Sequence, residues 1–152
     1  MYVFDTSALV EAWVRLYPPR RFPALWENID ELINDERAVA PHEVLEELKA
    51  QDDDLLQWAK DRSDGFIRPT SRQVMLAARD VLEDHPKLTK PGKGRGKADP
   101  FVVALAETID WTVVTQERGG TAEKPKIPYV CGERGVNCMS DLDIIDAEDW
   151  TF

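Results

Sequence analysis

The sequence is poor in the features that mark secreted, zinc-stabilised or membrane-spanning proteins. Only two of its 152 residues are cysteines, Cys131 and Cys138, which is too few for a disulfide framework. A structural zinc site needs about four Cys or His ligands, and only His42 and His85 are available to complete one. No run of about 18 apolar residues is present, and the N-terminal segment lacks the basic start and small-residue cleavage site of a secretory signal. We therefore expect a cytoplasmic protein with reduced thiols and no membrane contact.

Positive charge is also scarce. The chain has 19 Lys and Arg against 29 Asp and Glu, a net charge of −10, which argues against a protein that coats nucleic acid. The bases are unevenly spread, because the segment between His85 and Ala98 contains no acid. Its basic residues are Lys87, Lys90, Lys93, Arg95 and Lys97. We therefore expect one basic loop on an acidic body.

The order of apolar and turn-forming residues predicts strands that alternate with helices. The predicted strands are residues 2–4, 37–40, 65–68, 111–115 and 144–145, with a short β-like piece around Tyr129 and Val130. The predicted helices are residues 8–17, 25–33, 41–50, 52–59, 74–84 and 100–109. This alternation favours an α/β fold with a parallel sheet covered by helices on both faces. Internal repeats and domain linkers are absent from the sequence, so we expect a single domain over residues 1–152.

Four acidic positions are predicted at the carboxyl edge of this sheet, where parallel sheets gather their ligands. Asp5 directly follows the first strand, and Glu117 lies two residues after the strand 111–115. Asp99 is the expected N-cap of a helix that begins near the same edge. One of Glu43 and Glu47, which lie one turn apart on helix 41–50, is expected to join them. Each acid alone has an ordinary alternative as a helix cap or a solvated helix face, and only the coincidence of four favours a site.

Such a cluster has one chemical consequence. Packed carboxylates repel one another unless a cation neutralises them, and ligation by oxygen alone suits Mg²⁺ or Mn²⁺. A hard divalent ion with water in its shell can activate that water and stabilise charge on a phosphoryl oxygen, so phosphodiester hydrolysis is the expected use. The glycine-rich stretch GKGRGK does not match a nucleotide-binding P-loop, and no nucleophilic Ser or Cys triad is recognisable.

Four short motifs, in order along the chain, resemble those of PIN-domain ribonucleases. They are D-T-S-A-L from Asp5, P-x-E-V-x-x-E-L from Pro41, A-D-P-F-V-V-A-L-A from Ala98 and V-V-T-x-E from Val113. Two further stretches, F-P-A-L-W and K-I-P-Y-V-C-G-E-R-G-V-N-C, resemble an uncharacterised PIN-like subfamily found beside toxin–antitoxin modules. The resemblance covers most of the chain. It implies a three-layer α/β/α sandwich around a short, mostly parallel sheet.

The resemblance also implies roles for individual residues. The metal-binding and catalytic acids would be Asp5, Glu47, Asp99 and Glu117. Hydroxyls that support these carboxylates would come from Thr6 or Ser7 and from Thr115, with Glu43 as an extra ligand. Helical geometry allows either Glu43 or Glu47, and only the family pattern selects Glu47. The last acid departs from the commonest pattern, which has Asp where this chain has Glu117.

The implied activity is that of a Mg²⁺- or Mn²⁺-dependent endoribonuclease, in which a metal-activated water attacks the phosphorus in line and leaves a 5′-phosphate. The basic loop would hold RNA phosphates through Lys93, Arg95 and Lys97, and a solvated loop is the alternative. The alternatives for the whole protein are a catalytically inactive PIN-like scaffold that binds RNA or a protein, and a phosphatase or phosphotransfer domain. A phosphatase or phosphotransfer domain usually has a second acid near the first one, and this chain lacks such an acid near Asp5.

The resemblance further implies partners. PIN toxins of this kind are usually neutralised by a small antitoxin, and the negative charge of this chain suits a basic partner segment. PIN proteins also tend to form homodimers, for which some of the five tryptophans are candidate interface anchors. Cys131 and Cys138 resemble a paired feature of the subfamily. We expect two buried thiols near a hairpin, with a disulfide as the first alternative and zinc as the last.

Overall fold

The centre of the fold is a parallel β-sheet. In the computed structural model, which describes residues 1–50, 53–89 and 96–152, five strands form this sheet in the order β3-β2-β1-β4-β5, and every neighbouring pair is parallel. The strands are β1 (Tyr2–Phe4), β2 (Ala38–Pro41), β3 (Ile67–Arg68), β4 (Thr112–Val114) and β5 (Cys138–Met139). All residues of β1 and β2 are buried, as expected for strands covered on both faces.

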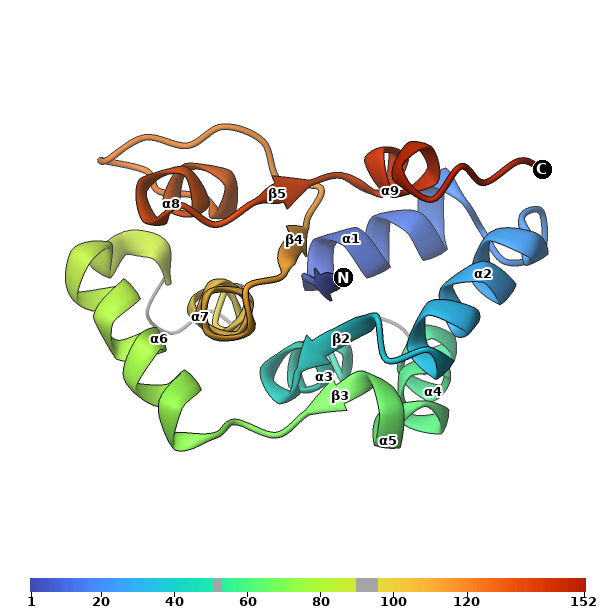
Figure 1. The fold of residues 1–152 in the computed structure, drawn as a ribbon, viewed down its shortest axis with the longest axis horizontal. Coiled ribbons are helices and arrows are strands. Elements are labelled where there is room, and N and C mark those ends of the chain that lie inside the picture. The colour runs from blue at the N-terminus through green and yellow to red at the C-terminus, as the bar shows by residue number, and fades with distance from the viewer. Residues whose placement is uncertain (51–52, 90–95) are drawn as a thin grey trace.

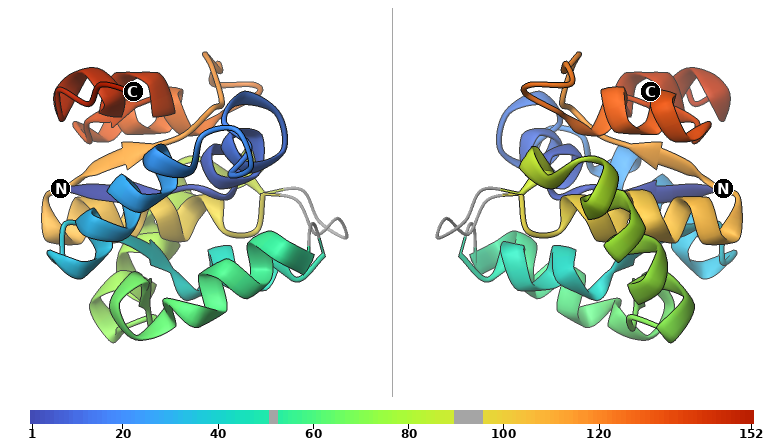
Figure 2. Two further views of the ribbon diagram at one scale, coloured as in Figure 1. Left: turned by 90° about the vertical axis from the view of Figure 1, so that its right-hand side faces the viewer. Right: turned by 90° about the vertical axis from the view of Figure 1, so that its left-hand side faces the viewer.

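Helices cover both faces of the sheet. Figure 1 shows α6, α7 and α8 on one side of the strands and α1, α2 and α9 on the other, which confirms the three-layer α/β/α arrangement. In the right-hand view of Figure 2, α6 lies over α7. The α-helices are α1 (Thr6–Glu11), α2 (Pro23–Asn34), α3 (His42–Leu48), α4 (Asp53–Asp61), α5 (Ser63–Phe66), α6 (Arg72–Asp84), α7 (Asp99–Ile109), α8 (Ile127–Arg134) and α9 (Asp141–Ala147). A π-helical turn, η1 (Ala12–Leu16), follows α1, and a 3₁₀ turn, η2 (Pro86–Leu88), follows α6.

The helix α7 is the central element of the core. Its sequence is apolar on most sides, and the residues from Val102 to Ala106 are all buried. It packs against β1, β2 and β4 on one side and against α6 on the other. Because α7 begins at Asp99, this packing fixes that acid at the carboxyl edge of the sheet. The sequence predicted Asp99 as the N-cap, but the helix begins one residue earlier than expected: the N-cap is Ala98, and Asp99 is the first helical residue.

Two sequence predictions of β-structure are wrong, and a third strand is shorter than predicted. Tyr129 and Val130 lie in α8, which has Pro128 near its start and ends at Gly135 with a positive φ of 69°. Ile144 and Ile145 lie in α9 rather than in a last strand. The predicted strand 65–68 is shorter, because Gly65 and Phe66 belong to α5. In α8 and α9, local helix-forming signals outweigh the strand preference of β-branched and aromatic residues.

The start of α9 shows how this happens. The Ser140 hydroxyl accepts a hydrogen bond from the Asp143 amide at 3.3 Å, and the Asp143 carboxylate accepts one from the Ser140 amide at 2.7 Å. This reciprocal capping box satisfies two amides that a helix start leaves without partners. The last strand lies directly before it, at Cys138 and Met139.

The cysteines lie on neighbouring elements. Cys131 in α8 is buried, Cys138 in β5 is half-buried, and both are free thiols. The strand β5 runs parallel to β4, so the hairpin predicted near these cysteines is wrong. Across the ranges that the structure describes, no helix has the length and apolar character required to cross a membrane.

Candidate active site

The carboxyl edge of the sheet carries a pocket of about 300 Å³ lined by acids. Each of the four acids singled out in the sequence contributes to it, although they come from the end of β1, from α3, from the start of α7 and from the segment after β4. The residues that line it are Asp5, Thr6, Ser7, Val10, Glu11, Glu47, Gly96, Asp99 and Glu117. Neighbouring parallel strands end together at this edge, which brings residues more than 100 positions apart into one pocket.

The pairing of β1 with β4 positions Asp5. Phe4 is in register with Val114, and the Asp5 amide donates to the Val114 carbonyl at 2.9 Å. The Asp5 carboxylate, 2% exposed, accepts hydrogen bonds from the Ser7 hydroxyl at 2.6 Å and the Thr115 hydroxyl at 2.8 Å. Asp5 precedes α1, but its side chain makes no capping hydrogen bond to that helix. Its carboxylate is therefore held by two hydroxyls at the pocket.

Two of the three glutamates that line the pocket, Glu47 and Glu117, are attached to helix starts. One oxygen of Glu47 accepts a hydrogen bond from the Ala98 amide at 3.0 Å, at the N-cap of α7. One oxygen of Glu117 accepts a hydrogen bond from the Ile127 amide at 3.0 Å, in the first turn of α8. Amides at helix starts lack intrahelical partners and favour negative charge. Each glutamate thus has one oxygen bound to the backbone.

Asp99 differs from the other three acids. Its side chain is only 8% exposed, and none of the hydrogen bonds among the described residues donates to its carboxylate. Burial raises the pKa of Asp99 to about 10, and the charges of Asp5, Glu117 and Glu47 add to the rise. Within the described residues, Asp99 is therefore a buried carboxyl group without a donor to stabilise its charged form.

The pKa values of Asp5, Glu47 and Glu117 are shifted in the same direction. Burial raises the pKa of Asp5, and the hydroxyls of Ser7 and Thr115 oppose the rise. Burial also raises the pKa of Glu47 and of Glu117, and in both cases the charge of Asp5 contributes. A set of mutually repelling carboxylates is stabilised by a cation, and its all-oxygen donors match the preferences of Mg²⁺ and Mn²⁺. The donor chemistry fits such an ion. In the conformations that the described residues adopt, no three acidic, His or Cys side chains converge on one metal position.

Other residues proposed from the sequence lie elsewhere. The Glu43 carboxylate accepts hydrogen bonds from the Thr70 hydroxyl at 2.5 and 2.9 Å, and Glu43 does not line the pocket formed by the described residues. Of the three bases assigned to RNA, Lys93 and Arg95 lie outside the described residues. Lys97 is exposed and is not part of the pocket lining in the described ranges.

The sequence analysis missed two acids. Glu11 of α1 lines the pocket and forms an ion pair with Arg15 at 3.1 Å. Asp141, at the start of α9, is buried and accepts a hydrogen bond from the Gln116 side chain at 2.6 Å. Burial raises its pKa to about 7, and the charge of Asp5 adds to the rise. Asp141 follows β5 as Asp5 follows β1, so a correct assignment of the last strand is the signal that would have found it. The backbone amide of Gln116 donates to the Ser7 hydroxyl at 3.1 Å, so Gln116 links Asp141 to the Asp5 side of the pocket.

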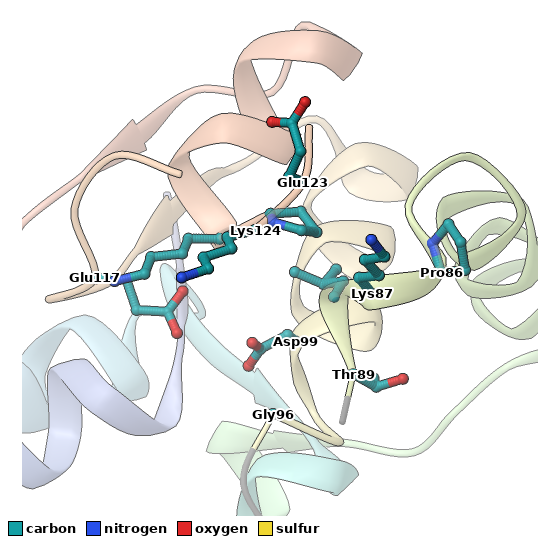
Figure 3. Close-up of a pocket in the computed structure, with 11 residues that line it drawn as sticks. Pro86, Lys87, Thr89, Gly96, Asp99, Glu117, Glu123 and Lys124 are labelled. Carbon is teal, nitrogen blue, oxygen red and sulfur yellow. The ribbon is translucent and has the colours of Figure 1, made fainter. Parts of the chain in front are cut away.

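A larger pocket of about 820 Å³ adjoins the acids (Figure 3). It shares Gly96, Asp99 and Glu117 with the smaller one, and the two carboxylates point into the same space. Its other lining residues are Pro86, Lys87, Leu88, Thr89, Glu123, Lys124, Pro125 and Lys126. The acidic pocket therefore opens onto a neighbouring pocket that carries lysines.

The sequence matches the family described as "Domain of unknown function (DUF4411)" over residues 2–152. The chain belongs to this family. No curated protein matches it at a significant level. The DUF4411 match spans every element of the fold and all four acids of the pocket.

Two solved structures share the fold of this DUF4411 chain. FitAcB from Neisseria gonorrhoeae has 17% sequence identity and a TM-score of 0.54, with 93% of this chain and 99% of that chain covered. FitAB bound to an IR36 DNA fragment has 16% identity and a TM-score of 0.57, with 93% and 95% covered. At this identity the likeness concerns the fold. The expected PIN-like fold is thereby confirmed, because the DUF4411 chain shares the architecture of these Fit structures.

Proposed function

We propose that the protein is a Mg²⁺- or Mn²⁺-dependent endoribonuclease that hydrolyses RNA phosphodiester bonds. The observation that carries the proposal is the pocket in which Asp5, Glu47, Asp99 and Glu117 meet. Burial raises the pKa of each of these acids, and the charges of neighbouring carboxylates add to the rise for Glu47, Asp99 and Glu117. The PIN-like fold supports it at the level of architecture.

The acids divide into two pairs by their contacts. Asp5 and Asp99 are the proposed principal ligands, because Asp99 has no compensating donor among the described residues and the hydroxyls of Ser7 and Thr115 orient Asp5. Glu47 and Glu117, each with one oxygen on a helix start, keep the other oxygen to orient the attacking water or to bind a second ion. A divalent ion held there supplies activation of that water and stabilisation of charge on the phosphoryl oxygen.

We further propose that the protein acts with an antitoxin. The support is its likeness in fold to FitAB, a complex whose structure has been solved on a DNA fragment, together with the resemblance to a subfamily found beside toxin–antitoxin modules. The net charge of −10 favours a basic partner segment. Co-expression with the protein encoded next to it, followed by co-purification, tests this partner separately from the activity.

The activity is tested with purified protein and single-stranded and structured RNAs in Mg²⁺, Mn²⁺ or EDTA. We expect cleavage only with a divalent ion, 5′-phosphate products, and loss of at least about 100-fold in rate for Asp99→Asn. The matched control is Asp61→Asn on α4, an exposed acid whose carboxylate accepts a hydrogen bond from Gln57, and it should cleave like the wild type. Cleavage that survives EDTA or Asp99→Asn refutes the proposal. RNA binding without cleavage would instead identify an inactive PIN-like scaffold.

A further inference from the structure

The pocket of about 820 Å³ beside the acids has walls of mixed character, which we call the lysine pocket. One wall is η2 with Thr89, and the other is the segment 123–126 ahead of α8 (Figure 3). Pro86, Leu88 and Pro125 give these walls apolar surface, while the shared edge carries the carboxylates of Asp99 and Glu117. Any ligand that extends from the acids into this space contacts cations and apolar groups together.

Three lysines supply the positive charge of the lysine pocket. Lys87, Lys124 and Lys126 are exposed, and none of them forms an ion pair with a carboxylate of the described residues. Burial raises the pKa of Glu117, and the nearby Lys126 ammonium opposes that rise, which places this cation beside the acidic pocket. The lining also contains three carboxylates, those of Asp99, Glu117 and the exposed Glu123. Because Asp99 and Glu117 belong to the proposed cation site, three unpaired ammonium groups face only Glu123 on the rest of the lining, which favours a polyanionic ligand.

The backbone that carries two of these lysines is held in place. The Thr121 amide donates to the Lys124 carbonyl at 3.0 Å, and the Lys124 amide donates to the Thr121 hydroxyl at 3.1 Å, which closes a turn. Pro125 is buried between the two exposed lysines. Gly120, with a φ of 107°, allows close packing, because a Cβ there would lie 2.7 Å from the Lys126 amide nitrogen. Lys124 and Lys126 therefore project from a fixed segment.

We propose that the lysine pocket binds the single-stranded RNA segment that adjoins the cleaved phosphodiester, with Lys87, Lys124 and Lys126 contacting its phosphates. This inference rests on the proposed nuclease function and adds the conformation of the substrate and the residues that position it. Contacts to phosphates fix the register of a strand without reading its sequence. The apolar walls suit the faces of unpaired bases, which a duplex keeps stacked and out of reach.

The test measures binding apart from cleavage. A fluorescently labelled single-stranded RNA is titrated in EDTA with the wild type, with the double variant Lys124→Gln/Lys126→Gln and with Lys87→Gln, and anisotropy is followed over a series of salt concentrations. We expect the double variant to lose about tenfold or more in affinity and the salt slope of log K to fall by about 0.7 for each lost contact. Lys60→Gln, an exposed lysine on α4, is the matched control and should leave affinity unchanged. A duplex of the same sequence should bind more weakly than the single strand.

Each alternative outcome is distinct. Equal affinity of the double variant and the wild type, or equal binding of duplex and single strand, overturns the inference. So does a double variant that keeps RNA affinity but loses affinity for a poly-glutamate peptide, because the pocket would then bind an acidic protein segment. If RNA binding depends on the lysines but the protein never cleaves RNA, the proposed nuclease function is refuted and RNA binding by the lysine pocket is supported. Cleavage that is indifferent to the lysines refutes only the pocket.

Discussion

The Glu117 carboxylate accepts a hydrogen bond from the Ile127 amide at 3.0 Å, which ties the segment after β4 to the first turn of α8. The Glu117 amide in turn donates to the Thr115 hydroxyl at 3.1 Å, and that hydroxyl donates to Asp5. A single side chain thus joins the acidic pocket to the helix that follows the lysines. The extra methylene of a glutamate relative to an aspartate gives the side chain the reach for this contact.

Two substitutions at Glu117 should separate its structural role from its charge. Glu117→Gln keeps an oxygen acceptor for the Ile127 amide, so we expect thermal unfolding close to that of the wild type but a loss of cleavage of at least about tenfold. Glu117→Ala removes the acceptor and should lower the free energy of unfolding by about 1 kcal/mol as well. If Glu117→Ala unfolds at the wild-type temperature, the contact with α8 makes no contribution to stability.

The carboxyl group of Asp99 should lower stability at neutral pH in the absence of metal. Its pKa of about 10 in the folded protein lies above the ordinary value of 3.8, so between these values the folded state holds a proton that the unfolded state releases. The free energy of unfolding therefore falls as pH rises through this window, and Asp99→Asn escapes that fall. We expect the variant to be more stable than the wild type at pH 8 in EDTA by at least about 1 kcal/mol, with a smaller difference at pH 5.

Mg²⁺ gives this prediction its control. The ion should raise the unfolding temperature of the wild type, because it binds the folded state only, and it should have little effect on Asp99→Asn. A stability difference between the two proteins that does not change with pH would show that the ionisation of Asp99 is not what lowers the stability of the wild type.

The core could be predicted from the sequence because its signals are local and repeated. The alternation of apolar strands and helices predicted the parallel sheet. The positions of Asp5 and Glu117 in the pocket could be predicted because each lies shortly after the end of a strand. The choice between Glu43 and Glu47 could not be made from helical geometry, since both lie on one face of α3. In the structure, the Thr70 hydroxyl donates to the Glu43 carboxylate and holds it away from the pocket. Thr70 lies 27 residues after Glu43, so the spacing of residues on α3 could not predict this contact.

The C-terminal third was harder to predict for a physical reason. Ile144 and Ile145 favour a strand by residue type, but the capping box of Ser140 and Asp143 starts a helix there. With the last strand misplaced, the buried Asp141 was missed. Lys124 and Lys126 were also missed, because they lie apart from the basic segment and reach the acids only through the turn at Thr121 and the close packing at Gly120.

Arg134 at the end of α8 should contribute to stability but not to activity. Its side chain, 11% exposed, forms ion pairs with Asp80 at 3.0 Å, Asp84 at 3.1 Å and Glu107 at 2.6 Å, and so joins α8 to α6 and α7. Arg134→Ala leaves three acids facing one another and should lower the free energy of unfolding by about 2 kcal/mol. Urea unfolding at low and high salt measures this. A cleavage rate per folded molecule that falls in the variant would contradict the assignment.

Gly120→Ala should disturb the lysine pocket without changing any charge. The φ of 107° at Gly120 is one that residues with a Cβ rarely adopt, and an added Cβ would lie 2.7 Å from the Lys126 amide nitrogen and 2.9 Å from the Tyr129 Cβ. The segment that carries Lys124 and Lys126 must shift, so we expect a loss of affinity for single-stranded RNA comparable to that of the double lysine variant.

Gly119→Ala is the matched control, because Gly119 also has a positive φ, 69°, but its Cβ would meet no atom within 4 Å. That control should lose only about 1 kcal/mol of stability and keep its RNA affinity. Equal RNA binding by the two alanine variants, both checked for folding by thermal unfolding, would show that the position of this segment does not govern binding.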